Sequence, residues 1–196
     1  MYEVELKVRA DLDRVRDRLD ELDAEGRGSV EQRDTYYDAP HREFAETDEA
    51  LRIRRERTSP TRDDRSREGG KAEETARVTY KGPLVDDASK TREEHETAVG
   101  DDGEAAEILR GLGFKPAAAV EKRRTIYDLD GYTVVLDDVT DLGEFVEVER
   151  EVSEGAVDEA REGAVDVLRS LGLDPDDGIR TSYLGLLLAR ADQPDD

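Results

Sequence analysis

The sequence predicts an α+β fold built from eight strands and about four helices. Most of the predicted strands alternate charged and apolar residues, and the predicted helices carry apolar residues along one face. The clearest strand is residues 2–9, where Glu3, Glu5 and Lys7 alternate with aliphatic residues. Because successive side chains of a strand point to opposite faces, this strand has one charged face and one apolar face.

Taken in chain order, the pattern predicts strands at residues 2–9, 33–38, 49–56, 76–82, 90–98, 120–129, 132–138 and 144–152. The Asp130-Gly131 pair between the sixth and seventh strands is typical of a tight hairpin turn. Apolar residues at helical spacing predict helices at 12–22, 105–112, 154–171 and 181–191. The fold class follows from this mixture of strands and helices.

We expect residues 1–196 to form a single domain. Of the 196 residues, 35% are hydrophobic and 42% are charged, which leaves little apolar material for two separate cores. Residues 58–74 are almost free of apolar side chains and contain Pro and paired Gly, so they are expected to form a mobile loop between two strands. Residues 192–196 are expected to be a frayed tail.

The formal net charge of −22 argues against nucleic acid as a partner, because phosphate backbones bind basic surfaces. Strong acidity with few lysines is instead typical of a protein that stays soluble in concentrated salt, so we expect a halophilic source. No apolar run approaches the roughly 20 residues that cross a bilayer, and the N-terminus shows no signal-peptide pattern, so we expect a cytoplasmic protein. The absence of cysteine excludes disulfides and thiolate chemistry.

Charged residues recur on one face of nearly every predicted strand. The cations are Lys7, Arg52, Arg54, Lys81, Arg92, Lys122 and Arg124, and the carboxylates are Glu3, Glu5, Glu94, Glu96, Asp137, Glu147 and Glu149. An antiparallel sheet with one solvated face would explain this pattern. The first and last strands are acidic, however, whereas the third, fourth and sixth carry cations, and this segregation by sign favours a site.

Eight antiparallel strands can close into a barrel whose interior holds side chains or one small ligand. If the charged faces point inward, the apolar faces point outward and the amphipathic helices cover them. Carboxylates two residues apart on a strand are about 7 Å apart, within reach of one metal ion or of two neighbouring ions. Oxygen ligands favour Mg²⁺ or Mn²⁺, and Arg and Lys bind phosphate oxygens. The pattern therefore indicates a metal-bound triphosphate in the interior of the barrel.

The chain resembles the CYTH domains, also called triphosphate tunnel metalloenzymes. Their first strand carries Glu-x-Glu-x-Lys, which "EVELK" matches at Glu3, Glu5 and Lys7. The likeness continues in order through "TYYDAP" (35–40), "ALRIRR" (50–55), "VTYKGP" (78–83), "TREEHE" (91–96), "VEKRRTIY" (120–127), "VVLDDVTDLGEFVEVE" (134–149) and "TSYLGLL" (181–187). The "LGEFVEVE" and "TSYLGLL" segments are most similar to the class IV adenylate cyclase branch.

The resemblance implies an eight-stranded antiparallel tunnel that binds triphosphates with a divalent metal, and it implies a role for each charged residue. The implied metal ligands are Glu3, Glu5, Glu147 and Glu149, with Asp137 aiding metal binding or catalysis. The implied triphosphate-binding residues are Lys7, Arg52, Arg54, Lys81, Lys122 and Arg124, with Arg92 as an additional contact. Lys7 and Asp137 are the candidate catalytic residues. A homodimer is implied by the resemblance alone.

Three functions remain open. The first is an adenylate cyclase that converts ATP into cyclic AMP and pyrophosphate. The second is a triphosphatase that hydrolyses inorganic or thiamine triphosphate in the same tunnel, since the same residues serve both reactions. The third is a non-catalytic module that binds a triphosphate.

Overall fold

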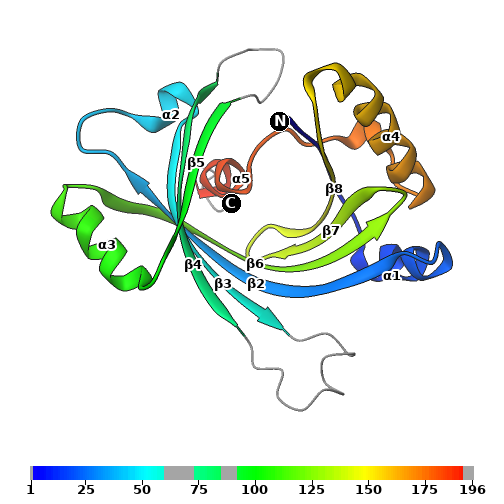
Figure 1. Ribbon diagram of the computed structural model, residues 1–196, viewed down its shortest axis with the longest axis horizontal. Coiled ribbons are helices and arrows are strands. Elements are labelled where there is room, and N and C mark those ends of the chain that lie inside the picture. The colour runs from blue at the N-terminus through cyan, green and yellow to red at the C-terminus, as the bar shows by residue number, and fades with distance from the viewer. Residues whose placement is uncertain (1, 60–72, 85–91, 192–196) are drawn as a thin grey trace. The chain divides into compact units, whose positions relative to one another are not determined.

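The computed structural model describes residues 2–59, 73–84 and 92–191, and within them it contains eight strands and five α-helices (Figure 1). The strands are β1 (Tyr2–Arg9), β2 (Glu25–Asp38), β3 (Ala50–Ser59), β4 (Glu74–Leu84), β5 (Arg92–Val99), β6 (Lys115–Leu129), β7 (Tyr132–Val139) and β8 (Gly143–Val152). The helices are α1 (Leu12–Glu21), α2 (Phe44–Thr47), α3 (Asp102–Gly111), α4 (Val157–Ser170) and α5 (Tyr183–Ala191), with 3-10 turns η2 (Glu154–Ala156) and η3 (Pro175–Asp177). The α+β class is confirmed.

The expected strands and helices are all present, with differences at their ends. Strands β2 and β6 begin at Glu25 and Lys115, earlier than expected. The pattern did not predict these first residues because they include Gly, Pro and Ala, which are uncommon in strands. The short helix α2 was not expected. The central residues 60–72 of the expected loop and the expected tail 192–196 lie outside the described residues. Within the described part of the chain, no helix is both long and apolar enough to cross a membrane.

The strands form one sheet in the order β1-β8-β7-β6-β2-β3-β4-β5. The pairs β1–β8, β7–β8, β6–β7, β3–β4 and β4–β5 are antiparallel. Asp130 and Gly131 connect β6 to β7 with φ of 51° and 80°, so the predicted tight hairpin is confirmed. Over the described residues β1 and β5 end this order, and closure into a barrel stays a prediction.

The chain forms two compact units, which are described separately. Unit 1 comprises Met1–Val30, Ser59–Lys71 and Lys122–Asp196. In it, helices α1 and α4 pack against the apolar side of β1 and β8, and Figure 1 shows α4 beside β8. The main core cluster includes Val8 of β1, Leu19 of α1, Val146 and Val148 of β8, and Leu168 of α4. The apolar face of these strands is therefore covered by amphipathic helices, as the alternation of residues predicted.

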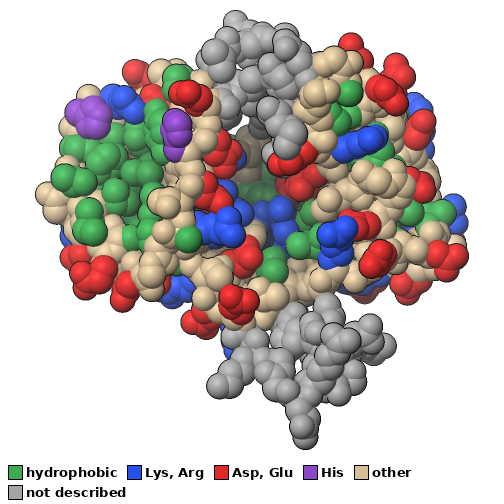
Figure 2. All heavy atoms as spheres, viewed as in Figure 1, with side chains coloured by type: hydrophobic (Ala, Val, Ile, Leu, Met, Phe, Trp, Pro, Cys, Tyr) green, Lys and Arg blue, Asp and Glu red, His purple; other side chains and the backbone are tan. Residues whose placement is uncertain are grey.

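Unit 2 comprises Glu31–Thr58 and Ala72–Glu121. Its apolar cluster is made of buried residues from β2, α2 and β3, with Leu109 of α3 and Phe114 packed against it. Figure 2 shows hydrophobic side chains gathered on the face that carries α2 and α3. Ile108 of α3 and Leu112, the residue that follows α3, are 62% and 64% exposed. The apolar residues Leu51 and Ile53 of β3 belong to this cluster, so the arginines that alternate with them point to the opposite face.

Two helical glycines provide a test of the packing in unit 1. A Cβ at Gly163 of α4 would collide with the Tyr132 hydroxyl and lie 2.9 Å from the ring carbon that bears it. A Cβ at Gly111 of α3 would meet no atom within 4 Å. We expect Gly163→Ala to lower the free energy of unfolding by about 1–3 kcal/mol through overpacking. Gly111→Ala, the matched control, should raise it by about 0.4–1 kcal/mol by restricting the unfolded chain. Urea denaturation in concentrated KCl measures both, and equal changes in the two variants would contradict the packing of Tyr132 on α4.

Candidate functional site

A charged cluster lies on the face of the unit 1 strands opposite α1 and α4. The antiparallel register places Lys7 of β1 opposite Glu147 of β8, and Glu5 opposite Glu149. Strand β6 pairs with β7 so that Arg124 lies opposite Asp137. The cluster, which we call the unit 1 charge cluster, consists of Glu5, Lys7, Lys122, Arg124, Asp137, Glu147 and Glu149. Strand pairing thus assembles residues from four segments that are distant in the sequence.

The centre of the unit 1 charge cluster is a network around Arg124. Its guanidinium forms two parallel bonds with Asp137, from Nε to Oδ1 at 2.8 Å and from Nη2 to Oδ2 at 2.7 Å. The same Nη2 donates to Glu147 Oε2 at 2.5 Å, and Nη1 lies 3.7 Å from Glu149 Oε1. Such forked contacts between a guanidinium and a carboxylate are among the strongest charge-assisted hydrogen bonds in proteins. Arg124 therefore holds three carboxylates in place.

Two lysines complete the unit 1 charge cluster. The Nζ atom of Lys7 lies 3.5 Å from Glu5 Oε1 and 3.5 Å from Glu147 Oε1, while Lys122 Nζ donates to Asp137 Oδ2 at 3.3 Å. Both lysines are buried, as are Asp137 and Glu147, which are 0% and 3% exposed. Charges are seldom buried to this degree unless opposite charges pair with them or a ligand neutralises them. The buried charges of the cluster are therefore stable only because oppositely charged groups lie beside them.

Burial and pairing act in opposite directions on the two central groups. Burial alone would raise the pKa of Asp137, but the hydrogen bonds and charge of Arg124, aided by Lys122, outweigh it and lower that pKa. Burial likewise disfavours the charged guanidinium of Arg124, yet the carboxylates around it raise its pKa well above the ordinary value. Asp137 and Arg124 are therefore both ionised at neutral pH.

Three carboxylates of the unit 1 charge cluster are spaced as metal ligands would be. Glu5, Glu147 and Glu149 each offer one ligand atom, and these atoms all lie within 4.8 Å of one another. An all-oxygen set of this kind suits Mg²⁺ or Mn²⁺ better than zinc. Asp137 stands apart from this triad, since its oxygens accept bonds from Arg124, Lys122 and Tyr183. Glu3 pairs through its backbone with Glu151 in β1 and β8, and its side chain lies outside the described part.

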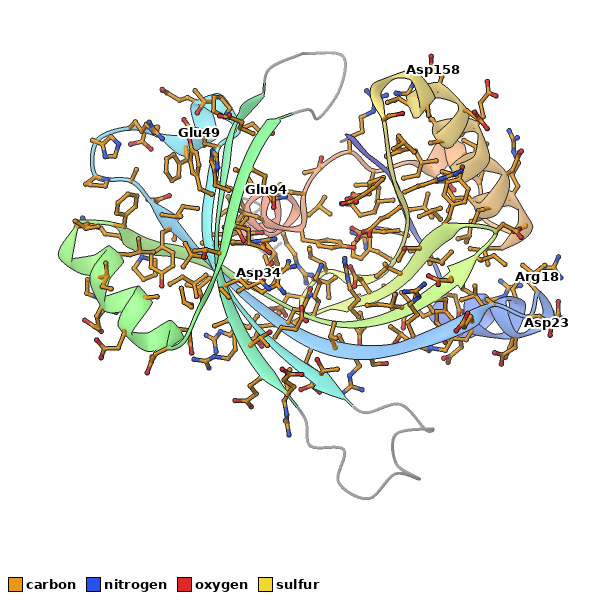
Figure 3. The ribbon with its side chains drawn as sticks, in the orientation of Figure 1. Arg18, Asp23, Asp34, Glu49, Glu94 and Asp158 are labelled. Atoms are coloured by element: carbon orange, nitrogen blue, oxygen red, sulfur yellow. The ribbon has the colours of Figure 1, made fainter. Side chains whose placement is uncertain are left out.

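Unit 2 contains a second charged cluster, centred on Asp34 of β2 (Figure 3). Arg54 donates from Nε and Nη2 to the two carboxylate oxygens of Asp34, each at 2.7 Å, and Arg52 donates from Nη1 at 3.0 Å. The Asp34 side chain is 3% exposed, whereas those of Arg52 and Arg54 are 12% and 17% exposed. The Nε atom of Arg52 is buried and has no hydrogen-bond partner among the described residues. One carboxylate thus orients two arginines.

The remaining predicted cations of unit 2 are less enclosed. Lys81 of β4 forms an ion pair with Glu94 of β5 at 2.9 Å, and the two side chains are 32% and 41% exposed. Glu96 instead accepts a bond from Thr79 at 2.8 Å and is paired with an exposed arginine. Arg92 is the first residue of β5, and its side chain is not among those described. The predicted residues of unit 2 are therefore grouped around β3, β4 and β5.

Sequence reasoning missed two polar residues of these clusters. Asp34 lies within the predicted strand 33–38. Aspartate is uncommon in strands, so its presence there was the signal that could have pointed to a role in the site. Tyr183 belongs to the apolar pattern that predicted the helix at 181–191. In the structure its hydroxyl donates to Asp137 Oδ2 at 3.0 Å. Nothing in the periodicity of a helix distinguishes such a tyrosine from a core residue.

Comparison with known proteins gives consistent matches along almost the whole chain. The family model described as "CYTH domain" matches residues 1–183. A protein of Methanocaldococcus jannaschii named "Putative adenylate cyclase MJ0240" is 37% identical over 188 residues, which cover 95% of this chain and 98% of that protein. The structure of the PH1819 protein from Pyrococcus horikoshii OT3 is 38% identical with a TM-score of 0.81, covering 96% of this chain and 99% of that one.

A more distant structure shares the fold alone. A Hippeastrum protein described as "Putative adenylyl cyclase HpAC1", with "a dominant triphophatase activity", is 16% identical with a TM-score of 0.65, covering 96% of each chain. The family model spans most of the sequence, and the relative from Methanocaldococcus jannaschii covers nearly all of it. On these grounds, the chain belongs to the CYTH domain family.

Proposed function

We propose that this protein is an adenylate cyclase that binds ATP with a divalent metal ion and converts it into cyclic AMP and pyrophosphate. The observation that carries the proposal is the carboxylate triad of Glu5, Glu147 and Glu149, which lies beside Lys7 and Arg124 on one face of the sheet. A site with carboxylates for a cation and cations for an anion fits a metal–triphosphate complex. The name of the relative from Methanocaldococcus jannaschii supports the same reaction.

The triad would hold Mg²⁺ or Mn²⁺, with Glu3 as a further ligand. Carboxylates about 4 Å apart repel one another by about 4 kcal/mol at an effective dielectric near 20, and a divalent cation relieves this repulsion. When bound, the ion neutralises phosphate oxygens and stabilises charge on the leaving group. Before the ion binds, Lys7 and Arg124 contact the carboxylate of Glu147, and the cluster still holds one more carboxylate than cations.

Cations of both units are assigned to the triphosphate. In unit 1 these are Lys7, Lys122 and Arg124, and in unit 2 they are Arg52, Arg54, Lys81 and Arg92. The fork of Arg54 on Asp34 fixes its guanidinium plane, and the buried Nε of Arg52 offers a donor that an anionic oxygen would satisfy.

In the proposed reaction the ribose 3′ oxygen forms a bond to the α-phosphorus, the bond from the α-phosphorus to the bridging oxygen of pyrophosphate breaks, and the hydroxyl proton passes to water. Lys7 and Arg124 stabilise the charge that develops on the departing oxygens, which is the main contribution of a protein to phosphoryl chemistry. Asp137 is held ionised by Arg124 and Lys122, and its role is to keep both cations aligned. Positioning of the nucleotide supplies the rest of the rate acceleration.

A triphosphatase is the second candidate, and the composition of the clusters favours it. The residues of the clusters are assigned to the metal and the phosphates, and none is assigned to a base or a ribose. Inorganic triphosphate can therefore bind the same groups. In this reaction a water oxygen would bond to a terminal phosphorus, and the bond to the neighbouring bridging oxygen would break. The Hippeastrum protein, which shares the fold, is described by such an activity.

The products distinguish the two enzymes from a module that only binds. We expect the purified protein in concentrated KCl with Mg²⁺ or Mn²⁺ to convert ATP into cyclic AMP and pyrophosphate, measured by chromatography. Release of orthophosphate from inorganic triphosphate without cyclic AMP would favour the triphosphatase. Binding of both compounds with no product would contradict an enzymatic function. Addition of EDTA should abolish turnover, because the proposed reaction needs the divalent ion.

Glu147→Gln tests the metal site. The amide keeps the size of the side chain but removes the charge that faces Lys7 and Arg124, so we expect metal-dependent activity to fall by at least about 10-fold. Glu162→Gln, the same change at an exposed position of α4, is the matched control and should leave activity unchanged. Both variants are assayed across a Mn²⁺ titration, with thermal unfolding to verify the fold. Full activity of folded Glu147→Gln would remove Glu147 from the site.

Arg52→Ala tests the phosphate contacts of unit 2. Loss of a charge-assisted donor should weaken binding of inorganic triphosphate by about 10-fold or more, measured by calorimetry without turnover. Arg55→Ala is the matched control, because Arg55 is on the same strand, points to the opposite face and pairs with Asp102. Equal affinities in the two variants would show that the Arg52 guanidinium does not bind the substrate.

A further inference from the structure

Tyr183 is the first residue of α5 and is buried in the unit 1 charge cluster, with 8% of its surface exposed. Its hydroxyl donates to Asp137 Oδ2 at 3.0 Å. The Nζ atoms of Lys7 and Lys122 lie over its ring, 4.5 Å and 4.9 Å from the ring centroid. The ring also meets Phe145 edge to face, with centroids 5.0 Å apart. One side chain therefore contacts an acidic residue and two basic residues of the cluster.

The backbone around α5 is tied to the strands of unit 1. The Ile179 N–H donates to the carbonyl oxygen of Lys7 at 2.7 Å, which anchors the segment before α5 to β1. Ser182 Oγ accepts a hydrogen bond from the Gly185 N–H at 3.1 Å and so caps the first turn of the helix. At the other end of α5, the Arg190 guanidinium donates to the carbonyl oxygen of Asp141. Tyr183 is thus held from both sides and does not depend on a ligand for its position.

The two parts of the tyrosine have different physical effects. The hydroxyl remains protonated, because burial and the negative charges of Glu147 and Asp137 raise its pKa, so it acts as a donor to Asp137. The face of an aromatic ring attracts cations without neutralising them. The ring therefore attracts the ammonium groups of Lys7 and Lys122 without adding a negative charge beside them.

We propose that Tyr183 is a positioning residue of this site, whose hydroxyl orients Asp137 and whose ring holds the ammonium groups of Lys7 and Lys122 in place for the phosphates. The proposal rests on the proposed function, in that these lysines bind the triphosphate. Tyr183 then has two effects, one of its hydroxyl on Asp137 and one of its ring on the two lysines. Substitutions that remove the hydroxyl alone, or the hydroxyl and the ring together, separate these effects.

Tyr183→Phe removes the hydroxyl and keeps the ring, whereas Tyr183→Leu removes both. Tyr132→Phe is the matched control, because Tyr132 is another buried tyrosine of unit 1, and its hydroxyl donates to the carbonyl oxygen of Ala160 at 3.1 Å, away from the cluster. We compare the full-length variants by calorimetric titration with inorganic triphosphate in EDTA, by kcat and KM with metal present, and by thermal unfolding.

We expect Tyr183→Phe to bind triphosphate within about twofold of the wild-type protein, since the ring is retained. Its kcat should fall about 10-fold through the loss of order at Asp137. Tyr183→Leu should bind triphosphate about 10-fold more weakly, because the lysines lose the ring. Tyr132→Phe should match the wild type in binding and in kcat. A lowered melting temperature with unchanged binding and kcat in Tyr183→Phe would show a purely structural role and would overturn the proposal.

The outcomes separate this proposal from the proposed function. If the wild-type protein binds triphosphate and the folded Tyr183 variants match Tyr132→Phe in binding and in kcat, the positioning role is wrong and the function stands. If the wild-type protein binds triphosphate neither in EDTA nor with Mg²⁺ or Mn²⁺ present, the proposed function is wrong and the positioning role falls with it. If Tyr183→Leu does not fold, the kcat of Tyr183→Phe decides, since that variant retains the ring that fills the space.

Discussion

The register of β1 against β8 is the constraint on which the charged face of unit 1 depends. In this register Lys7 lies opposite Glu147 and Glu5 opposite Glu149, while the aliphatic residues of both strands face α1 and α4. A shift by one residue would turn every side chain of a strand to the other face. The charges would then lie against the helices and the aliphatic residues would leave the core. Electrostatic pairing and apolar burial therefore enforce the same alignment.

The buried charges are tolerable because each of them has an oppositely charged partner. Removal of a carboxylate from water is costly, and an unpaired buried charge destabilises a protein by several kcal/mol. Asp137 is fully buried and accepts a forked contact from Arg124, which also contacts Glu147. Such a network satisfies its own members and still presents both signs of charge. A ligand that itself carries both signs, such as a metal-bound phosphate, can join it without leaving a charge unpaired.

The two clusters differ in which sign of charge is in excess. In unit 1 the carboxylates outnumber the cations among the residues of the charge cluster, and an additional cation would balance them. In unit 2 the single carboxylate of Asp34 contacts two arginines, so the positive charge is in excess and an anion would balance it. Under the proposed function, the metal ion supplies the positive charge that unit 1 lacks, and the phosphates contact the cations.

Much of the fold could be predicted because alternation and helical spacing are local properties. The alternation of Glu5 and Lys7 with aliphatic residues was visible in β1, as was the hairpin at Asp130 and Gly131. The first parts of β2 and β6 could not be predicted, since Gly, Pro and Ala form strands there only beside neighbouring strands. The charged residues of the candidate site were likewise visible as a pattern of alternating residues. Their roles in binding metal or phosphate stay predictions.

The sequence by itself determined which residues are charged, which face of each strand they occupy and which helices cover the opposite face. Only the tertiary structure decided which charges meet. It paired Asp137 with Arg124 and left Glu5, Glu147 and Glu149 as the triad, and it brought Asp34 to Arg52 and Arg54. It also carried Tyr183 to a residue 46 positions earlier in the chain. The physical reason is that periodicity acts within one element, whereas contacts depend on strand register and on how separate elements pack.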